Sequence, residues 1–278
     1  MVHLQIWMLM MIELFLVGIG TGNPAHVTIQ AINQLKAADI IMIPRKGEHK
    51  SDLVDLRHQI CDELLGEDAP PLIEFDLPVR DDNKSYLTAV DEWHDAIAEI
   101  WQDCIQAARK TITTNITHVA MLIWGDPALY DSSLRIASRL TPAPIITIIP
   151  GITSVQALTA AHKIPLNEIG KPFIITTGRQ LTSNGFPKEV DTAIIMLDGK
   201  CAFQSLEQDL YHIWWGAYLG MKSEVIIDGQ LSKVADRIIQ TRQQERAKHG
   251  WIMDSYMLRR EKTRKKLGKR TVLHKHEK

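Results

Sequence analysis

The stretch Val17-Gly18-Ile19-Gly20-Thr21-Gly22-Asn23-Pro24 decides the fold of this 278-residue chain. The apolar run before it, residues 12–17, is typical of a buried strand, and glycines form the turn that follows. We expect a helix to begin at Asn23, because Asn is a good N-cap and Pro24 suits the first helical position. The helix is expected to bury Val27, Ile29, Ile32 and Leu35. A strand, a glycine turn and a helix in this order open a parallel sheet.

The same alternation of strand and helix continues through the first 165 residues. Further strands are expected at 40–43, 72–75, 119–123 and 145–149, and Pro44 is expected to end the first of them. Helical patterns separate the strands, and Ser51 is placed to cap one of these helices. Strands that alternate with helices predict a parallel sheet covered by helices on its faces.

The pattern changes after Ile164-Pro165, where strands become more frequent. They are expected at 173–177, 192–197, 213–218, 224–227 and 251–258, with one long helix over 232–248. The sequence therefore predicts an α/β fold of two domains. The domains are an N-terminal α/β domain with a parallel sheet over 12–165 and a C-terminal α/β domain with a mixed sheet over 166–260. A basic, disordered tail follows over 261–278.

The balance of charges excludes a protein built to bind nucleic acid. The chain has 32 Lys and Arg against 33 Asp and Glu, but eight of these cations and only two of the acids lie in residues 261–278. The rest of the chain carries seven more acids than bases. Affinity for nucleic acid comes mainly from Lys and Arg on phosphates, so an acidic body does not fit that function. An anionic substrate must be met by local cations.

The spacing of the cysteines and the composition of the amino-terminal segment indicate the cellular compartment. Cys61, Cys104 and Cys201 form no C-x-x-C pair, so neither a zinc site nor a redox pair is predicted, and a reducing cytoplasm fits best. The apolar stretch over residues 2–17 includes His3, Gln5 and Glu13, and it is shorter than the roughly 20 residues that a membrane-spanning helix needs. We expect no membrane segment.

Three loops follow strands of the first sheet, at the edge where open α/β sheets bind ligands. The first, residues 18–22, is rich in glycine, which allows a ligand to approach the backbone. It lacks the dinucleotide fingerprint, because the third glycine is replaced by Asn23 and the acidic residue expected at the end of the second strand is replaced by Ile43-Pro44. Binding of NAD is therefore disfavoured, and a tight turn without a ligand stays an alternative.

The second and third loops each carry polar groups suited to a nucleoside. In the segment from Trp124 to Tyr130, the carboxylate of Asp126 can accept hydrogen bonds from ribose hydroxyls or an ammonium group, and Leu129 can cover a base. Asp126 can equally serve as the cap of a turn. Thr153 and Ser154 can cap the next helix and still present a hydroxyl or an N–H group to a ligand.

The order of these loops resembles the tetrapyrrole (corrin/porphyrin) methyltransferase family. The motifs are V-G-x-G-x-G-N-P, G-D-P-x-x-Y and P-G-I-T-S, followed by Ile-Pro-Leu-Asn, and the likeness extends from Ile12 to Arg260. Segments outside these loops, at 46–53, 75–80, 93–95, 215–220 and 249–254, resemble the branch that acts on precorrin-5.

The resemblance implies a methyltransferase of cobalamin biosynthesis that works as a cytoplasmic homodimer. It would transfer a methyl group from S-adenosylmethionine to carbon C1 of precorrin-5 and release acetate. The cofactor would bind in a cleft between the two domains. By position, the cofactor contacts would be Thr21, Trp124, Gly125, Asp126, Leu129, Thr153, Ser154, Leu197, Gly216 and Ala217. Thr21, Asn23 and Trp124 depart from the commoner Pro, Asp and Gly of the family.

The implied substrate carries many carboxylates, so Arg and Lys should line the mouth of the cleft. The candidates are Arg45, Lys46, Lys50, Arg80 and Arg179, each of which can instead be an ordinary solvated charge. No metal is expected. Removal of the acetyl unit needs a general base or an oxyanion donor, and the sequence does not single one out among Tyr130, Asp198 and His94.

Other functions stay open at this point. They are an NAD(P)-dependent oxidoreductase, methylation of a different precorrin, methylation of RNA or of a protein side chain, and non-catalytic binding in which the tail docks a partner. The tail over 261–278 has few apolar residues, so we expect it to be dispensable. Its clustered cations can alternatively steer a polyanionic substrate.

Overall fold

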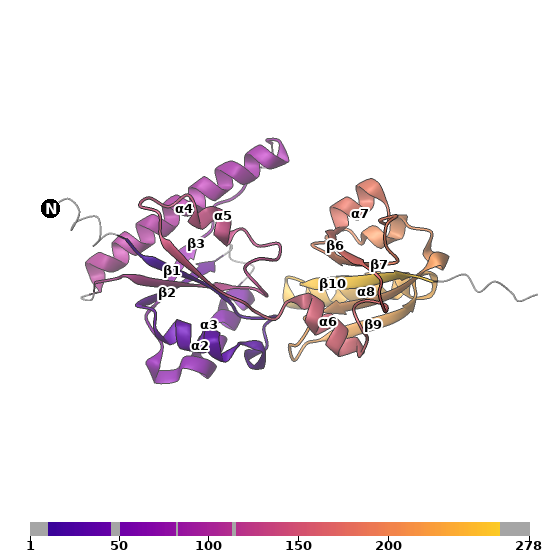
Figure 1. Cartoon of the computed structure of the whole chain (residues 1–278), viewed down its shortest axis with the longest axis horizontal. Coiled ribbons are helices and arrows are strands. Elements are labelled where there is room, and N and C mark those ends of the chain that lie inside the picture. The colour runs from indigo at the N-terminus through magenta and orange to yellow at the C-terminus, as the bar shows by residue number, and fades with distance from the viewer. Residues whose placement is uncertain (1–10, 46–50, 82, 113–114, 262–278) are drawn as a thin grey trace, which may run out of the picture.

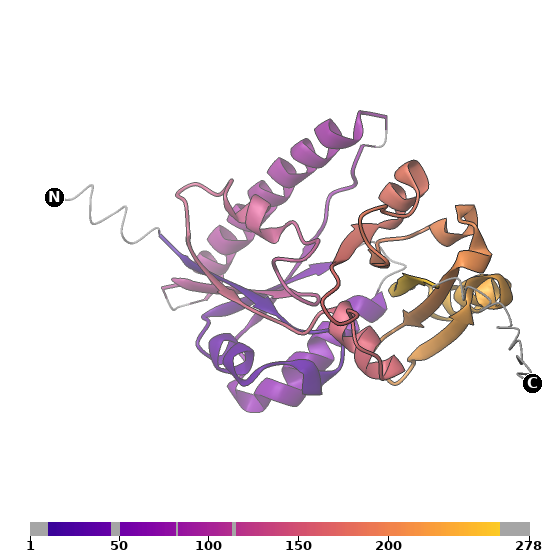
Figure 2. The same ribbon diagram turned by 45° about the vertical axis from the view of Figure 1, so that its right-hand side comes forward.

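The computed structural model describes residues 11–45, 51–81, 83–112 and 115–261, which form two five-stranded sheets with helices around them (Figure 1). The first half of the described chain builds one sheet and the second half builds the other (Figure 2). None of the helices in these ranges is long and apolar enough to cross a membrane.

The first sheet is entirely parallel, as the alternation of strands and helices predicts. Its strands are β1 (Glu13–Gly18), β2 (Ile40–Arg45), β3 (Leu72–Asp76), β4 (His118–Ile123) and β5 (Ile145–Ile149). They stand in the order β3-β2-β4-β1-β5. The carboxyl ends of β4, β1 and β5 are therefore neighbours, so the three loops that follow these strands lie side by side.

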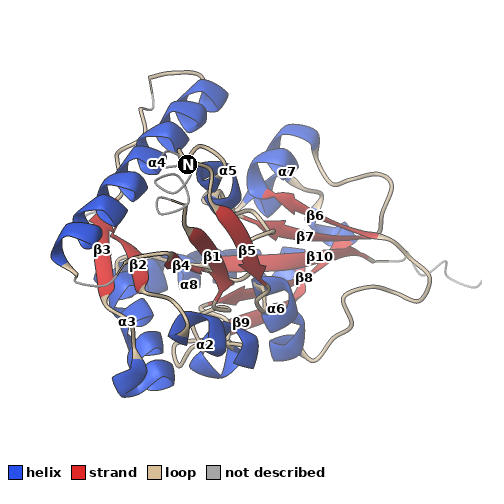
Figure 3. Ribbon diagram, turned by 60° about the vertical axis from the view of Figure 1, so that its left-hand side comes forward, coloured by secondary structure: helices blue, strands red, loops and turns tan. Residues whose placement is uncertain are grey.

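Helices cover both faces of this sheet (Figure 3). The helices α2 (Ile29–Lys36) and α3 (Ser51–Leu65) pack on one face, and α4 (Tyr86–Thr111) and α5 (Ser133–Ala137) pack on the other. Successive residues of β1 alternate between the two cores, Leu14 and Leu16 toward α4 and Phe15 and Val17 toward α2. This double burial explains why the strand sequence is continuously apolar.

Two local predictions in this half are wrong. Asn23 caps only the short 3-10 helix η1 (Pro24–His26), and α2 begins later, where Thr28 accepts a hydrogen bond from the backbone of Ala31. Ile29 is consequently 77% exposed and does not belong to the buried stripe. Pro44 does not end β2, which continues to pair with β3 as far as Arg45. Pairing of β2 with β4 ends at Met42, so the missing N–H of Pro44 removes no hydrogen bond to β4.

The second sheet is mixed, also as predicted. Its strands are β6 (Phe173–Thr177), β7 (Thr192–Met196), β8 (Tyr211–Ala217), β9 (Val225–Gln230) and β10 (Asp254–Arg260). Their order is β6-β7-β10-β8-β9, in which only β6 and β7 are parallel neighbours. The helices α7 (Gly178–Asn184) and α8 (Leu231–His249) share one core with this sheet, and α6 (Ser154–His162) packs on its other face.

Residues near the ends of the two predicted domains make contacts across the predicted boundaries. The helix α6 falls within the range 12–165, but its Val155 and Leu158 share a core with Ile194 and Met257 of the second sheet. Glu261, the first residue of the predicted tail, donates its backbone N–H to the carbonyl of Leu210 at 2.8 Å. The tail from residue 262 onward lies outside the described residues.

Candidate functional site

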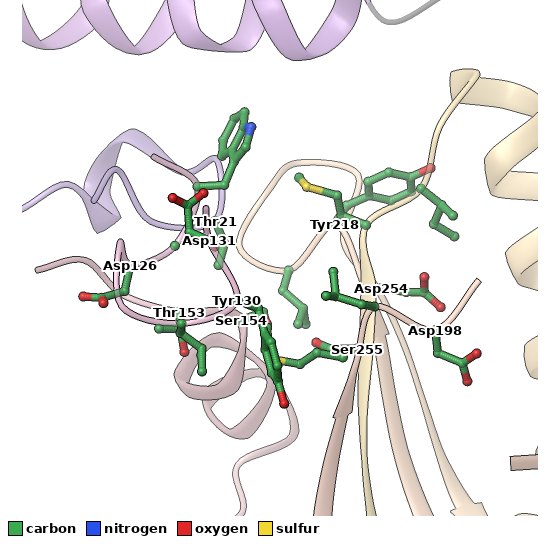
Figure 4. Close-up of a pocket in the computed structure, with 18 of the residues that line it drawn as sticks. Thr21, Asp126, Tyr130, Asp131, Thr153, Ser154, Asp198, Tyr218, Asp254 and Ser255 are labelled. Carbon is green, nitrogen blue, oxygen red and sulfur yellow. The ribbon is translucent and has the colours of Figure 1, made fainter. Parts of the chain in front are cut away.

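A cavity of about 370 Å³ lies between the loops of the first sheet and the strand ends of the second (Figure 4). In Figure 4, Thr21, Tyr130, Asp131, Thr153 and Ser154 form one wall, and Tyr218, Asp254 and Ser255 form the wall opposite. The residues that line it are Gly20, Thr21, Trp124, Gly125, Asp126, Leu129, Tyr130, Asp131, Thr153, Ser154, Met196, Leu197, Asp198, Gly199, Tyr218, Leu219, Arg242, Ile252, Met253, Asp254 and Ser255.

Glycines bring the three loops of the first sheet into contact. A Cβ atom at Gly18 would lie 2.6 Å from the backbone nitrogen of Gly151, and one at Gly151 would overlap the carbonyl oxygen of Gly125. The backbone N–H of Gly125 also donates to the carbonyl of Gly20 at 2.7 Å. Because no side chain fits between the loops, their backbones pack directly on one another, and two of their glycines, Gly20 and Gly125, line the cavity and form what we call the glycine floor.

Asp126 fastens two of these loops together. Its Oδ1 accepts a hydrogen bond from the N–H of Ala128 at 2.8 Å, and its Oδ2 accepts one from the N–H of Gly151 at 3.0 Å. Figure 4 shows the carboxylate directed away from Tyr218 and Ser255 on the opposite wall. The side chain therefore serves as a turn cap and as a clasp between the loops after β4 and β5.

Two buried hydroxyl groups in the cavity wall have no hydrogen-bond partner among the residues that the structure describes. They are Oγ of Ser154, in the first turn of α6, and Oγ of Ser255, on β10. The cap of α6 is provided by the neighbouring Thr153, whose Oγ1 accepts from the N–H of Val155 at 3.1 Å. A buried polar group without a partner is costly, so these two hydroxyls are suited to bind a ligand.

Three non-glycine residues of the cavity wall have a left-handed backbone, a conformation that residues other than glycine rarely adopt. Their φ angles are 52° at Tyr130, 52° at Leu197 and 51° at Tyr218. Leu197 directly follows β7 and Tyr218 directly follows β8, so each strand turns sharply where it reaches the cavity. Such backbone strain concentrates at functional sites.

A buried polar network supports the wall formed by the second sheet. Arg242 binds Asp254 through Nε at 2.9 Å and Nη2 at 3.3 Å, and Trp215 donates its Nε1 to the same carboxylate at 3.0 Å. The phenol of Tyr256 donates to Oδ2 of Asp198 at 2.6 Å. Burial and the adjacent Asp198 carboxylate raise the pKa of Tyr256 well above its usual value, so the phenol stays protonated.

The cavity lining is acidic and suits a ligand with positive charge. It contains Asp131, Asp198 and Asp254 against the single guanidinium of Arg242, whereas the carboxylate of Asp126 is directed away from the opposite wall. Oδ1 of Asp131 accepts from the N–H of Ser133 at 2.7 Å. Within the described ranges, no three His, Cys, Asp or Glu residues gather as a metal site would require.

The predicted cofactor residues line this cavity, with two exceptions. Gly216 and Ala217 lie within β8 and do not reach it. A Cβ at Gly216 would meet Cδ2 of Leu219 at 2.5 Å, so this glycine makes room for Leu219, which does line the cavity together with Tyr218. The residues in the wall are Thr21, Trp124, Gly125, Asp126, Leu129, Thr153, Ser154 and Leu197.

The structure places two of the three candidate bases in the cavity wall. Tyr130 and Asp198 line the cavity. His94 does not, because it is buried on α4 beside Trp93, where its role is to fill the core. Sequence reasoning missed Arg242, Asp254 and Ser255. Pairing of β10 with β8 brings Asp254 and Ser255 to the cavity, and Arg242 reaches it from α8 by binding Asp254.

The predicted substrate cations have different surroundings. Arg179 on α7 lies 4.0 Å from the ring centroid of Tyr86, and Arg80 lies 5.5 Å from the same ring, so residues of both halves meet at this phenol. Arg45 instead binds the carboxylate of Asp76 through Nε at 3.0 Å and Nη2 at 2.9 Å. Lys46 and Lys50 lie outside the described residues.

The two-sheet fold and the glycine-floored cavity between the sheets define a class of enzymes, and sequence comparison assigns the chain to it. The chain belongs to the family of Tetrapyrrole (Corrin/Porphyrin) Methylases, whose model matches residues 13–235. It is 45% identical over 253 residues to precorrin-6A synthase (deacetylating) of Sinorhizobium sp, a match that covers 89% of this chain and 95% of the relative.

Solved structures agree with this family. A cobalamin synthesis related protein (CobF) of Corynebacterium diphtheriae is 36% identical, with a TM-score of 0.73 over 90% of this chain and 99% of that one. Uroporphyrin-III C-methyl transferase of Thermus thermophilus, solved with S-adenosyl homocysteine, has a TM-score of 0.52 over 88% of this chain and 96% of that one. At 18% identity the second likeness concerns the fold alone.

Proposed function

We propose that this chain is a precorrin-6A synthase, which transfers a methyl group from S-adenosylmethionine to carbon C1 of precorrin-5 and releases the acetyl unit as acetate. The observation that carries the proposal is the 45% identity to the Sinorhizobium synthase. That likeness extends over 89% of the chain and so includes both sheets and the cavity between them.

The residues of the cavity fit the proposed cofactor, which supplies a methyl group on a positively charged sulfonium. The glycine floor allows close approach of a nucleoside, and Ser154 and Ser255 offer hydroxyls that lack partners. The acidic lining favours the positive charge of the cofactor. Asp126 would act indirectly, by holding the floor loops in place, since backbone N–H groups occupy both of its oxygens.

The arginines at Tyr86 would bind the carboxylates of the macrocycle. Arg80 lies in the loop after β3 and Arg179 lies on α7, so one substrate can engage both halves of the protein at once. The ring of Tyr86 orients both guanidinium groups through cation–π contacts. Arg45 is less suited to this role, because Asp76 and Glu74 already neutralise it.

Release of acetate consumes one water molecule, whose hydroxyl joins the acetyl carbon while the electron pair of the broken bond stays with the macrocycle. Asp198 is poorly suited as the base, because it accepts hydrogen bonds from Tyr256, Lys200 and Ala202. The phenol of Tyr130 stays protonated, since burial raises its pKa, but it already donates to the carbonyl of Ile175 at 3.3 Å. We assign no catalytic base.

The proposal includes a homodimer in the cytoplasm. Support for the dimer comes from β5, an edge strand on which Ile145 is 55% exposed and Ile148 is 44% exposed. An exposed apolar edge strand is a surface that a second chain can cover. The three cysteines are unpaired, in accord with a reducing compartment.

Two measurements test the proposed function. Calorimetric titration should show binding of S-adenosylhomocysteine and none of NADH, and the reverse result would favour an oxidoreductase. The protein should then transfer labelled methyl to precorrin-5 in preference to precorrin-2. Preferential methylation of precorrin-2 would keep the family but overturn the assigned substrate.

A further inference from the structure

Arg57 is a buried cation on α3 that the proposed function leaves unexplained. The residue is 7% exposed. Its Nη1 donates to the carbonyl of Leu53 one helical turn earlier at 3.3 Å, and its Nε is buried with no partner. Guanidinium groups offer five N–H donors, so most of the bonding capacity of Arg57 is unused inside the protein.

No carboxylate among the described residues forms an ion pair with Arg57. Asp131 attracts it only through longer-range Coulomb interaction. Burial lowers the pKa of Arg57 to about 10, which still leaves the side chain charged at neutral pH. A buried and unpaired charge is costly, and an apolar residue of similar volume is often as stable or more stable in its place. The folding of the chain therefore gives no reason for a cation here.

The place of Arg57 connects it to the cavity. Its guanidinium lies 4.7 Å from the ring centroid of Trp124, and Trp124 lines the cavity. Asp131, the carboxylate that attracts Arg57, lines the same wall and is seen there in Figure 4. Arg57 is not itself among the residues that line the cavity, but two of its neighbours are, Trp124 through ring contact and Asp131 through longer-range charge attraction.

We propose that Arg57 binds a ligand carboxylate at the Trp124 end of the cavity. The inference rests on the proposed function, which brings two such carboxylates, one on the amino-acid end of the cofactor and one on the side chains of the tetrapyrrole. The cofactor is favoured, because an amino-acid end carries a carboxylate for Arg57 and an ammonium for Asp131. Trp124 holds the guanidinium in place by stacking on it.

The test compares Arg57→Met and Arg57→Lys with the matched control Arg237→Met, an exposed arginine on α8. Without ligand, Arg57→Met should melt at the same temperature as the unsubstituted protein or higher. Its dissociation constant for S-adenosylhomocysteine should rise at least tenfold, whereas binding of methylthioadenosine, which lacks the amino-acid end, should not change. Arg57→Lys should retain part of the affinity, and Arg237→Met all of it.

The remaining outcomes are equally decisive. Unchanged S-adenosylhomocysteine binding with a raised KM for precorrin-5 in Arg57→Met assigns the carboxylate to the tetrapyrrole and supports the proposal. A lower melting temperature of Arg57→Met, with both affinities and the KM unchanged, shows a structural role and overturns it. Failure of the proposed function is recognised separately, because then the unsubstituted protein itself binds no S-adenosylhomocysteine.

Discussion

Replacing Asp126 by asparagine is expected to weaken cofactor binding through the loops that Asp126 holds. The carboxylate accepts from Gly151 N–H at 3.0 Å and from Ala128 N–H at 2.8 Å. Asparagine keeps one acceptor oxygen and places an NH₂ group, a donor, against the other N–H. One hydrogen bond to a charged group is lost, which is worth about 1.5 to 3 kcal/mol.

Part of this energy should appear in the affinity for S-adenosylhomocysteine, because both fastened loops line the cavity. We expect a loss of about 1 to 3 kcal/mol, and each 1.4 kcal/mol, roughly, corresponds to a tenfold change in the dissociation constant. Isothermal titration calorimetry measures this change directly. Unchanged affinity in a folded Asp126→Asn variant would refute the clasp as a determinant of the site.

Asp39→Asn provides the matched control. Oδ2 of Asp39 accepts from the backbone N–H groups of Thr117 at 2.7 Å and His118 at 2.8 Å, so it joins the start of β2 to the start of β4, as Asp126 joins the loops after β4 and β5. It does so at the amino ends of the strands, opposite the cavity. The control should lower the melting temperature and leave the affinity for S-adenosylhomocysteine unchanged.

Four further predictions follow from particular side chains. Arg80→Ala and Arg179→Ala should bind S-adenosylhomocysteine normally but raise the KM for precorrin-5, and added salt should reduce this increase in KM. A variant with the KM of the unsubstituted protein at low salt would show that its arginine does not bind the substrate. Burial lowers the pKa of His94 below 6.5, so its contribution to the free energy of unfolding is complete above pH 6.5 and declines as pH falls through the lowered pKa. His94→Leu should reduce this decline, measured by urea unfolding between pH 7.5 and 5.5, by about 1 kcal/mol or less. An unaltered pH profile of stability in the variant would contradict this expectation. Ile148→Lys should convert the proposed homodimer to monomers in sedimentation velocity, and an unchanged sedimentation coefficient would exclude β5 from the proposed interface. Truncation after Glu261 should leave melting temperature and turnover at low salt unchanged, whereas a loss of substrate capture that high salt abolishes would establish steering by the tail.

The architecture of the first sheet could be predicted because β1, β2, β4 and β5 are mostly apolar and each has a glycine or proline at its carboxyl end or within two residues of it. The strands at 145–149 and 173–177 were predicted with the bounds that the structure has. The predicted start of a helix was wrong where two local signals compete. Asn23-Pro24 and Thr28 each offer a helix start, and only packing of Ala31 and Leu35 on the sheet selects Thr28.

The residues of the candidate site could be predicted only where the sequence around them carries a local signal. Loops that follow strands of the first sheet carry their own signal, so Thr21, Gly125 and Ser154 were predicted where the cavity lies. Ser255 and Arg242 give no local signal, because antiparallel pairing and a helix across the second sheet bring them to the wall. Arg57 looks in the sequence like one charge among many on a helix, and only its burial against Trp124 distinguishes it.

The proposed enzyme couples methyl transfer to loss of the acetyl unit, and both products can be measured in one experiment. Precorrin-5 and S-adenosylmethionine labelled in the methyl group are incubated with the protein, and the methylated product and free acetate are quantified together by mass spectrometry. We expect labelled product and acetate to form in equal amounts, and only when the protein is present. Absence of labelled product from folded protein that binds S-adenosylhomocysteine, or methylation without acetate, would overturn the proposed function.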